Sequence, residues 1–201
     1  MCSSDLEEPL DLSSVQAALE DIANDGHRAS QVILRIRSLV KKQAPEKAPV
    51  NLSDIAREVL ALVGHESQRK QVTLLSDLHA SLPPVAGDRV QLQQVLLNLA
   101  MNAIEAMSES EGDARELKVE TKMAAESVLV TVADTGPGLD STQAEQIFRP
   151  FHTTKSGGMG MGLAISRSII ESHGGKLWAE GNEHRGATFK FTLPKIDGQT
   201  S

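Results

Sequence analysis

Three short stretches of this sequence combine amide, carboxylate and glycine residues at spacings that could hold a nucleotide. The string Asn98-Leu-Ala-Met-Asn102 places two side-chain amides four residues apart, on one face of a helix. Asp134-Thr-Gly136-Pro-Gly138 puts a carboxylate at a tight turn, and residues 157–163 leave backbone N–H groups bare beside a helix start. These are a metal ligand, a base reader and a phosphate cradle, so we predict that together they outline an ATP site.

The amide pair suits a magnesium ion that is bound mainly by phosphates. Mg²⁺ prefers oxygen ligands and keeps most of its waters, so a nucleotide site offers it only one or two side chains. The amide oxygens of Asn98 and Asn102 could serve, with apolar neighbours on the other side of the helix. Taken alone, the pair would be interpreted as solvated or backbone-bonding amides.

The acidic turn follows a predicted strand and could recognise a base. A buried carboxylate at Asp134 can accept from the exocyclic amine of adenine, which guanine carries at a different place. Gly136 and Gly138 permit a positive φ where the chain must let a planar ligand approach. Without the other motifs, the same string would be an ordinary turn.

The third stretch contains Gly158, Gly160 and Gly162 and opens onto a helix whose N-terminal dipole favours phosphate. Lys155 lies just upstream and could add a point charge, although an ordinary exposed lysine is the competing interpretation. The spacing differs from Gly-x-x-x-x-Gly-Lys-Ser/Thr, which excludes a P-loop NTPase.

Apolar periodicity predicts the elements that position these motifs. Steps of three and four residues predict helices, and alternation predicts strands. The helices are expected over 51–68, 88–107 and 163–173, and the strands over 72–78, 116–123, 127–133, 176–180 and 187–193. Helices mixed with antiparallel strands favour an α+β fold, a two-layer α/β sandwich.

A long amphipathic helix is predicted before this domain, over residues 11–42. Its apolar stripe, from Leu12 to Val40, needs a partner from another chain or from an upstream segment. We therefore expect a partial dimerisation region over 1–44, a linker broken by prolines over 45–50, a catalytic domain over 51–195 and a disordered tail over 196–201.

Composition and charge limit the kinds of partner that we expect for this chain. The 201 residues carry a formal charge of −7 without any long basic run, so nucleic acid is not expected as a ligand. Apolar runs are far shorter than the roughly 20 residues of a membrane span, and no signal pattern begins the chain, so we expect no membrane contact by this segment. The single cysteine, Cys2, fits a reducing cytoplasm.

The motifs together resemble the catalytic domain of sensor histidine kinases, in the superfamily shared with gyrase B, MutL and the heat-shock chaperone ATPases. Residues 98–107 are similar to the N box, 134–139 to the G1 box, 147–155 to the F box and 158–163 to the G2 box, in family order and at family distances. Residues 186–194 resemble the closing strand. The resemblance covers about 49–195 and implies the Bergerat fold, with residues 11–42 as the second dimerisation helix.

The resemblance also implies roles for individual residues. Asn102 would bind Mg²⁺, Asn98 would support the metal or phosphates during catalysis, and Lys155 would hold and stabilise the phosphates. Asp134 would read the adenine amine. The remaining nucleotide-binding residues would be Gly136, Gly138, Gly158, Gly160, Gly162, Leu163 and Thr188. Phe148 and Phe151, in the F box, would be packing anchors of the lid over the nucleotide.

One residue departs from the family pattern. Many members carry a basic residue three positions after the second asparagine, where this chain has Glu105. That phosphate contact would have to come from Lys155 or Arg149, or be absent.

The activity implied is transfer of the ATP γ-phosphoryl group to a histidine on an upstream helix, absent from this chain, in a homodimer that then signals to a response-regulator receiver domain. His27 lacks the acidic neighbour of the family's acceptor, and we interpret the other histidines, His173 among them, as surface residues. Two alternatives remain open from the residues: a serine kinase of the anti-sigma type, and a non-catalytic nucleotide-binding dimerisation module.

Overall fold

The computed structural model describes residues 47–108, 114–140, 144–152, 160–182 and 185–196, which belong to one compact unit over Pro45–Ser201. The helix predicted over 11–42 lies outside the described residues. Among those described, none of the helices has the length and apolar character needed to cross a bilayer.

The main sheet has five strands in the order β2-β4-β5-β7-β6. Their bounds are β2 Thr73–Leu78, β4 Glu116–Met123, β5 Ser127–Asp134, β6 Lys176–Gly181 and β7 Ala187–Pro194. All pairs are antiparallel except β2 with β4, which the sequence did not predict. A parallel pair needs a crossover, and the chain between these two strands supplies it as a helix.

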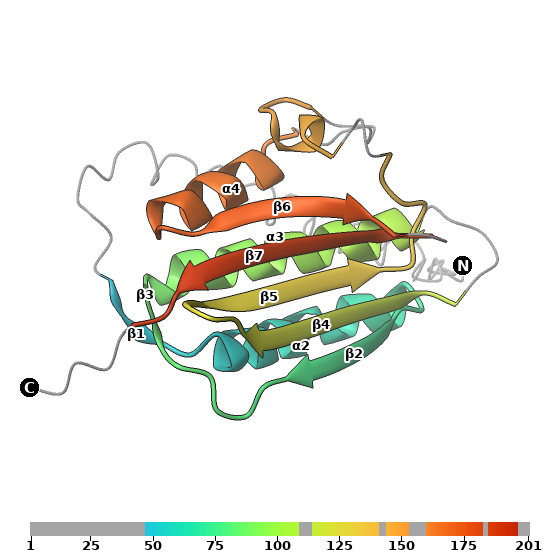
Figure 1. Cartoon of the computed structure of the whole chain (residues 1–201). Coiled ribbons are helices and arrows are strands. Elements are labelled where there is room, and N and C mark those ends of the chain that lie inside the picture. The colour runs from blue at the N-terminus through green and yellow to red at the C-terminus, as the bar shows by residue number, and fades with distance from the viewer. Residues whose placement is uncertain (1–46, 109–113, 141–143, 153–159, 183–184, 197–201) are drawn as a thin grey trace, which may run out of the picture. The chain divides into compact units, whose positions relative to one another are not determined.

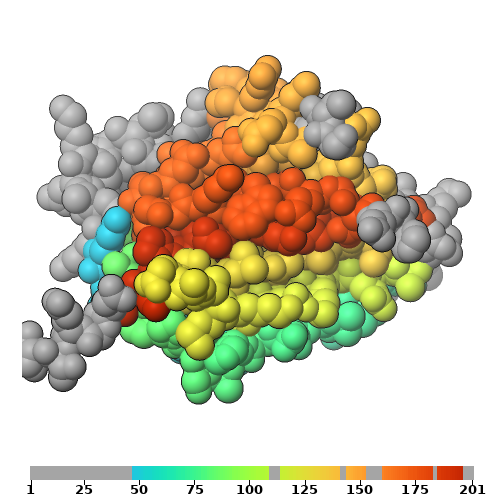
Figure 2. All heavy atoms as spheres, in the orientation of Figure 1, coloured from blue at the N-terminus to red at the C-terminus, as the bar shows by residue number. Residues whose placement is uncertain are grey.

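Three helices cover one face of this sheet: α2 (Leu52–Arg69), α3 (Arg89–Ser108) and α4 (Gly162–Ser172) (Figure 1). The predicted two-layer α/β sandwich is therefore confirmed. The opposite face of the strands is not covered by a second helical layer in the view of Figure 2.

Strand alternation determines which side chains reach the helices. On β5, Val128, Val130 and Val132 are buried and alternate with partly exposed residues, and Asp134 continues the buried series. The final core position of this strand thus carries a carboxylate where the pattern calls for an apolar side chain. Its neighbour β7 buries Phe189, Phe191 and Leu193 on the same side. The core between sheet and helices consists mainly of aliphatic residues, in a chain whose aromatic content is only 2%.

A second, two-stranded sheet begins the unit. β1 (Ala48–Val50) pairs antiparallel with β3 (Val85–Gly87), so the predicted linker over 45–50 is wrong for its last three residues. Two prolines at the linker hid this strand, since proline weakens any strand prediction. Ile196, the first residue of the expected tail, is bonded to the domain, because its N–H donates to the Pro84 carbonyl, and the rest of that tail lies outside the described residues.

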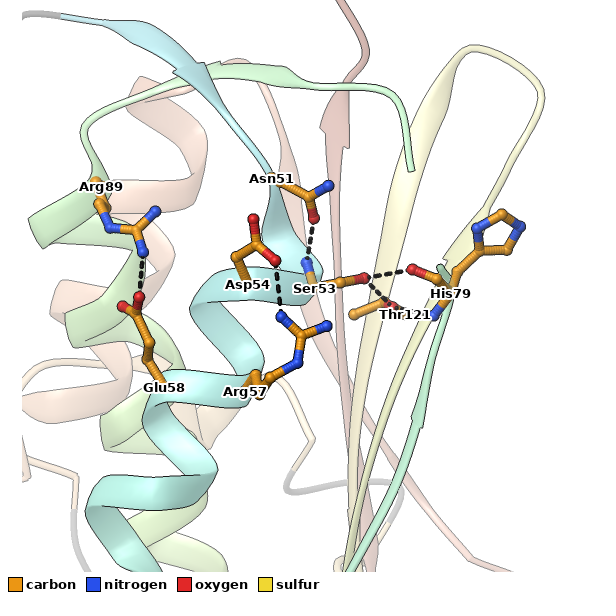
Figure 3. A network of polar contacts seen from close by, with 8 residues as sticks. All are labelled: Asn51, Ser53, Asp54, Arg57, Glu58, His79, Arg89 and Thr121. Atoms are coloured by element: carbon orange, nitrogen blue, oxygen red, sulfur yellow. Dashed lines mark hydrogen bonds and ion pairs between the residues drawn. The ribbon is translucent and has the colours of Figure 1, made fainter. Parts of the chain in front are cut away.

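The start of α2 is fixed by side-chain hydrogen bonds (Figure 3). The Asn51 side chain caps the helix by accepting from the Ser53 N–H at 2.8 Å. The Ser53 hydroxyl lies 2.8 Å from the Thr121 hydroxyl and donates to the His79 carbonyl, and the His79 N–H donates to Thr121. This closed set of bonds ties α2 to the ends of β2 and β4, so the helical layer has a fixed register on the sheet.

Candidate nucleotide site

Helix α3 is the central element of the candidate site because it carries both asparagines. Asn98 and Asn102 are half-buried on one face, in a helix whose other positions bury Leu96, Leu99 and Ala103 against the core. A helical turn of four residues separates the two amides, as predicted from their spacing.

At the Asn98 position, α3 meets the start of α4. The Asn98 Nδ2 donates to the Ser166 hydroxyl at 3.0 Å, and a Cβ added at Gly162 would overlap the Asn98 Oδ1. A larger residue at the first position of α4 would therefore displace the Asn98 side chain. The third motif and the first asparagine are thus brought into direct contact, and the N-terminal turn of α4 lies beside the amide.

Two turns further along the same face, α3 meets the acidic loop. A Cβ at Gly136 would lie 3.5 Å from the Met107 side chain and 3.6 Å from the Ala106 Cβ. Asn98 and Ala106 are eight residues apart, which is about 12 Å along a helix, with Asn102 midway between them. The asparagines therefore lie on the side of α3 that the other two motifs contact. The distance between these two contacts suits a nucleoside triphosphate.

Asp134 lies at the end of β5 and is only 5% exposed. Its Oδ1 accepts from the Gly136 N–H at 2.8 Å and from the Ala187 N–H at 3.2 Å. Burial raises the pKa of the Asp134 carboxyl, and the two backbone donors offset part of that rise. The group is held in a fixed orientation by its own loop and by β7, which leaves its Oδ2 as the acceptor with no protein donor recorded among the described residues.

Thr188 does not lie where the sequence-based prediction placed it. The register pairs it with Ala133, so it occupies the opposite face of the sheet from Asp134. Its hydroxyl donates to the Asn182 Oδ1 at 2.7 Å, and the Asn182 Nδ2 donates to the Asp134 carbonyl at 3.2 Å. Ala187 is the residue of β7 that faces the Asp134 carboxylate. The prediction that Thr188 lines the base pocket is therefore wrong, because it missed the strand alternation by one residue.

The positive φ predicted for the acidic turn is confirmed at Gly138 but not at Gly136. Gly138 has φ of 93° and packs against Gly186, whose φ is 90°. Gly160 has φ of 62°, and a Cβ there would lie 2.7 Å from the His152 carbonyl oxygen. Two predicted phosphate-binding residues, Lys155 and Gly158, lie outside the described residues.

The two lid phenylalanines differ from each other. Phe148 is buried, with the Arg167 guanidinium 3.8 Å from its ring centroid and Phe189 in an edge-on contact. Phe151 is 70% exposed and has a φ of 66°, which is rare for a bulky residue. The expected anchoring role is thus confirmed for Phe148 and wrong for Phe151.

His173 was expected at the surface, but it is only 4% exposed. Its Nε2 accepts from the Asp88 N–H at 3.0 Å, while its Nδ1 lies 2.7 Å from the Ile169 carbonyl oxygen. Asp88 in turn caps α3 by accepting from the Val90 N–H. The histidine therefore joins the end of α4 to the start of α3. Its position one turn after Ile169 on the apolar face of α4 is the signal that could have revealed it.

The donor set in the described ranges fits a phosphate-bound magnesium ion better than a protein-bound metal. No group of three or more histidine, cysteine, aspartate or glutamate side chains capable of holding an ion occurs in the described residues. What α3 offers is the amide oxygens of Asn98 and Asn102, which suit a hard cation whose other ligands are phosphates and waters.

Comparison with known proteins agrees with this geometry. Residues 87–197 match the family model described as histidine kinase-, DNA gyrase B- and HSP90-like ATPase. The sensor protein FixL of Bradyrhizobium diazoefficiens is 46% identical over 186 residues, which cover 91% of this chain and 36% of FixL. The chain thus spans about a third of that relative's length.

Solved structures of histidine kinase ThkA share the fold. Its catalytic domain superposes with a TM-score of 0.67 at 36% identity, covering 75% of this chain and 96% of the ThkA domain. ThkA in complex with the response regulator protein TrrA superposes with a TM-score of 0.73 at 29% identity, covering 98% of this chain and 55% of that one.

Proposed function

Because the chain belongs to the family of histidine kinase-, DNA gyrase B- and HSP90-like ATPases and carries the catalytic ATPase domain of sensor histidine kinases, we propose that it binds ATP along α3 and transfers the γ-phosphoryl group to a histidine of the full protein. One observation carries the proposal: the start of α4 at Gly162 and the Asp134 loop both contact α3, the helix that carries Asn98 and Asn102, within the length of one nucleotide.

The base end of the nucleotide belongs at Asp134. Its carboxylate is buried and oriented by two N–H groups, so it can accept from an amine at one position only. Adenine presents an amine donor, whereas guanine presents a carbonyl oxygen at the equivalent ring position, which would be repelled. Gly136 and Gly138 let the loop approach the ring without side chains in the way.

The phosphate end belongs at the start of α4. The first-turn N–H groups around Gly162 and Leu163 point away from the helix, where they favour an anion. Gly160 and Gly158 would continue this backbone cradle, and Lys155 would add positive charge as the γ-phosphoryl group leaves.

A magnesium ion would be held between the phosphates and α3, by Asn102 with Asn98 beside it. When bound, it neutralises phosphate charge and favours an in-line geometry of transfer. The support for this assignment is the pair of amide oxygens on the face that also carries the contacts to both ends of the nucleotide.

Asn98 also bears on the choice between transfer and hydrolysis. Hydrolysis needs a general base that takes up a proton from the attacking water, and the Asn98 amide cannot take up that proton. The Asn98 amide is instead bonded to Ser166. We therefore expect slow hydrolysis, with the phosphoryl group kept for a nucleophile that another domain presents.

The partners proposed are those of a two-component system in the cytoplasm. Residues 11–42 would form the second of two dimerisation helices, and the acceptor histidine would stand on the first, upstream of this chain. The full protein would be a homodimer and would pass the phosphoryl group to a receiver aspartate. ThkA's complex with a response regulator supports the last step.

The test is a transfer experiment with γ-labelled ATP and a longer fragment of the same protein that includes the region before residue 1. We expect label on that fragment in an acid-labile, base-stable form, the signature of a phosphohistidine. An acid-stable phosphoserine would favour the anti-sigma type of kinase. Binding of ATP without any transfer would leave a passive nucleotide-binding module, and either result would overturn the proposal.

A further inference from the structure

The loop that carries Asp134 is supported from behind by the turn between β6 and β7. A Cβ at Gly181 would overlap the Leu139 carbonyl, and a Cβ at Gly186 would overlap the Asp134 carbonyl. The two glycines at the ends of the turn therefore contact the two ends of the Asp134 loop. Neither contact leaves room for a side chain, so the turn and the loop fit each other closely.

Asn182 lies between these two contacts and links the turn to the loop by hydrogen bonds. Its backbone N–H donates to the Gly186 carbonyl at 3.0 Å, which closes the turn. Its Nδ2 donates to the Asp134 carbonyl at 3.2 Å. The backbone of Asp134 is thus held on one side by the Asn182 amide, and its carboxylate on the other by the Gly136 and Ala187 N–H groups.

The Asn182 amide is oriented in turn by Thr188. The Thr188 hydroxyl donates to the Asn182 Oδ1 at 2.7 Å, which fixes the amide so that its Nδ2 faces the Asp134 carbonyl. Thr188 is itself buried on β7, one residue from the Ala187 N–H that holds the carboxylate. Its position in a paired strand makes it a rigid starting point for the chain of bonds.

We propose that Thr188 and Asn182 are positioning residues that act through Asp134 to set the preference of the site for adenine over guanine. This inference rests on the proposed function. Recognition of a base amine by a single acceptor depends on the position of the acceptor oxygen. If the Asp134 loop shifts, the preference for adenine over guanine is expected to fall. Thr188 lies on the opposite face of the sheet from the Asp134 carboxylate, and Asn182 bonds to the Asp134 backbone, so we expect neither residue to touch the base.

The experiment measures the dissociation constants of ATP and GTP for the 201-residue chain by calorimetry in magnesium buffer. Variant T188V removes the bond from Thr188 to Asn182, N182A removes both bonds of the Asn182 amide, and T188S keeps the hydroxyl. T192V is the matched control, because Thr192 lies on the same face of the same strand and pairs with Lys176 and Leu129, away from Asn182.

We expect T188V and N182A each to weaken ATP binding by roughly 2- to 10-fold, the range for one neutral hydrogen bond, and to leave GTP binding unchanged. The double variant should lose little more than either single variant, since the two residues act in series. T188S and T192V should keep the wild-type preference. In a D134N background, T188V should have no further effect on the ATP-to-GTP ratio.

Three results would overturn the inference. An unchanged ratio in both T188V and N182A would show that the pair positions nothing, and full additivity in the double variant would show that the residues act separately. Equal weakening of ATP and GTP would indicate a general loss of structure, and a melting curve on each variant would identify it. Failure of the wild-type chain to bind ATP would instead overturn the proposed function, and this inference with it.

Discussion

Asp134 is the most unusual of the candidate site residues, because it places a carboxylate at a core position of β5. A buried carboxylate is tolerated where backbone N–H groups bond to it, and Gly136 and Ala187 supply two. The burial of this carboxylate is confirmed, and its role as the acceptor for a base amine stays a prediction.

Replacing this carboxylate by an amide should weaken ATP binding. Asp134→Asn keeps the shape of the side chain but can present an N–H group to the base amine, so two donors would face each other. We expect a loss of at least about 2 kcal/mol, roughly 30-fold in affinity. Calorimetry with ATP measures it, and an unchanged dissociation constant would remove Asp134 from the site.

The same variant gives a prediction on stability against pH. Because burial raises the pKa of the folded Asp134 above the value of about 3.9 in an unfolded chain, the folded state binds the proton more tightly. The contribution of Asp134 to stability is therefore most favourable below about pH 3.9. It declines as the pH rises through the window up to the raised pKa and is constant above that.

Urea unfolding of the wild type and of Asp134→Asn across this pH range checks the sign. The difference in the free energy of unfolding, wild type minus variant, should fall with rising pH, by up to about 1.4 kcal/mol per pH unit inside the window. The subtraction removes the other titrating groups. A difference that rises with pH would mean that the N–H donors outweigh burial.

At the scale of elements, the site depends on how α3 and α4 are held together. They are joined at two places: Asn98 bonds to Ser166 beside the candidate site, and His173 bonds to Asp88 at the far end. The start of α3 is thus tied to the end of α4, so the two helices run antiparallel. This pairing fixes the asparagines of α3 against the N-terminal turn of α4.

Two substitutions at His173 test whether its hydrogen bond with the Asp88 N–H stabilises the domain. His173→Leu leaves the Asp88 N–H buried without an acceptor, so the free energy of unfolding should fall by about 1–3 kcal/mol. His173→Gln, whose amide oxygen can reach the Asp88 N–H, should recover part of that loss. Chemical unfolding at pH 7 measures both. Equal stability of the leucine variant and the wild type would show that this link does not hold the helices.

For the whole molecule, the described part of the chain is one layered unit with a short N-terminal strand at its edge. β1 pairs with β3, and β3 leads directly into Asp88 and α3. Val50 of this strand is buried in the core, and Lys47 donates to the Ser172 carbonyl at the end of α4. The residues just before α2 therefore belong to the folded domain.

Two truncations test this boundary. A chain of residues 45–201 should bind ATP as tightly as the 201-residue chain, because every candidate site residue lies within it. A chain of residues 52–201 lacks β1 and Val50 and should unfold more easily, by about 2 kcal/mol or more. Unfolding curves and ATP calorimetry on the pair decide it. Equal stability of the two truncated chains would show that residues 48–50 act as part of the linker and do not stabilise the domain.

The sequence alone determined the helices and main strands and the three motifs, because apolar periodicity and special residue types are local properties. It also predicted roles for Asn98, Asn102, Asp134 and the glycines from residue type and spacing. It could not give the parallel pairing of β2 with β4, because pairing joins residues about 40 positions apart and depends on which faces can be buried together.

Only the tertiary structure decided which face of a strand a residue occupies and which distant groups meet. Thr188 was misplaced by one step of alternation, and the burial of His173 depends on the arrival of Asp88 from 85 residues away. The sequence analysis did not single out Asn182, and only the fold brings its amide to the Asp134 carbonyl. Local patterns specify chemistry, whereas orientation and support come from contacts that form when the layers pack.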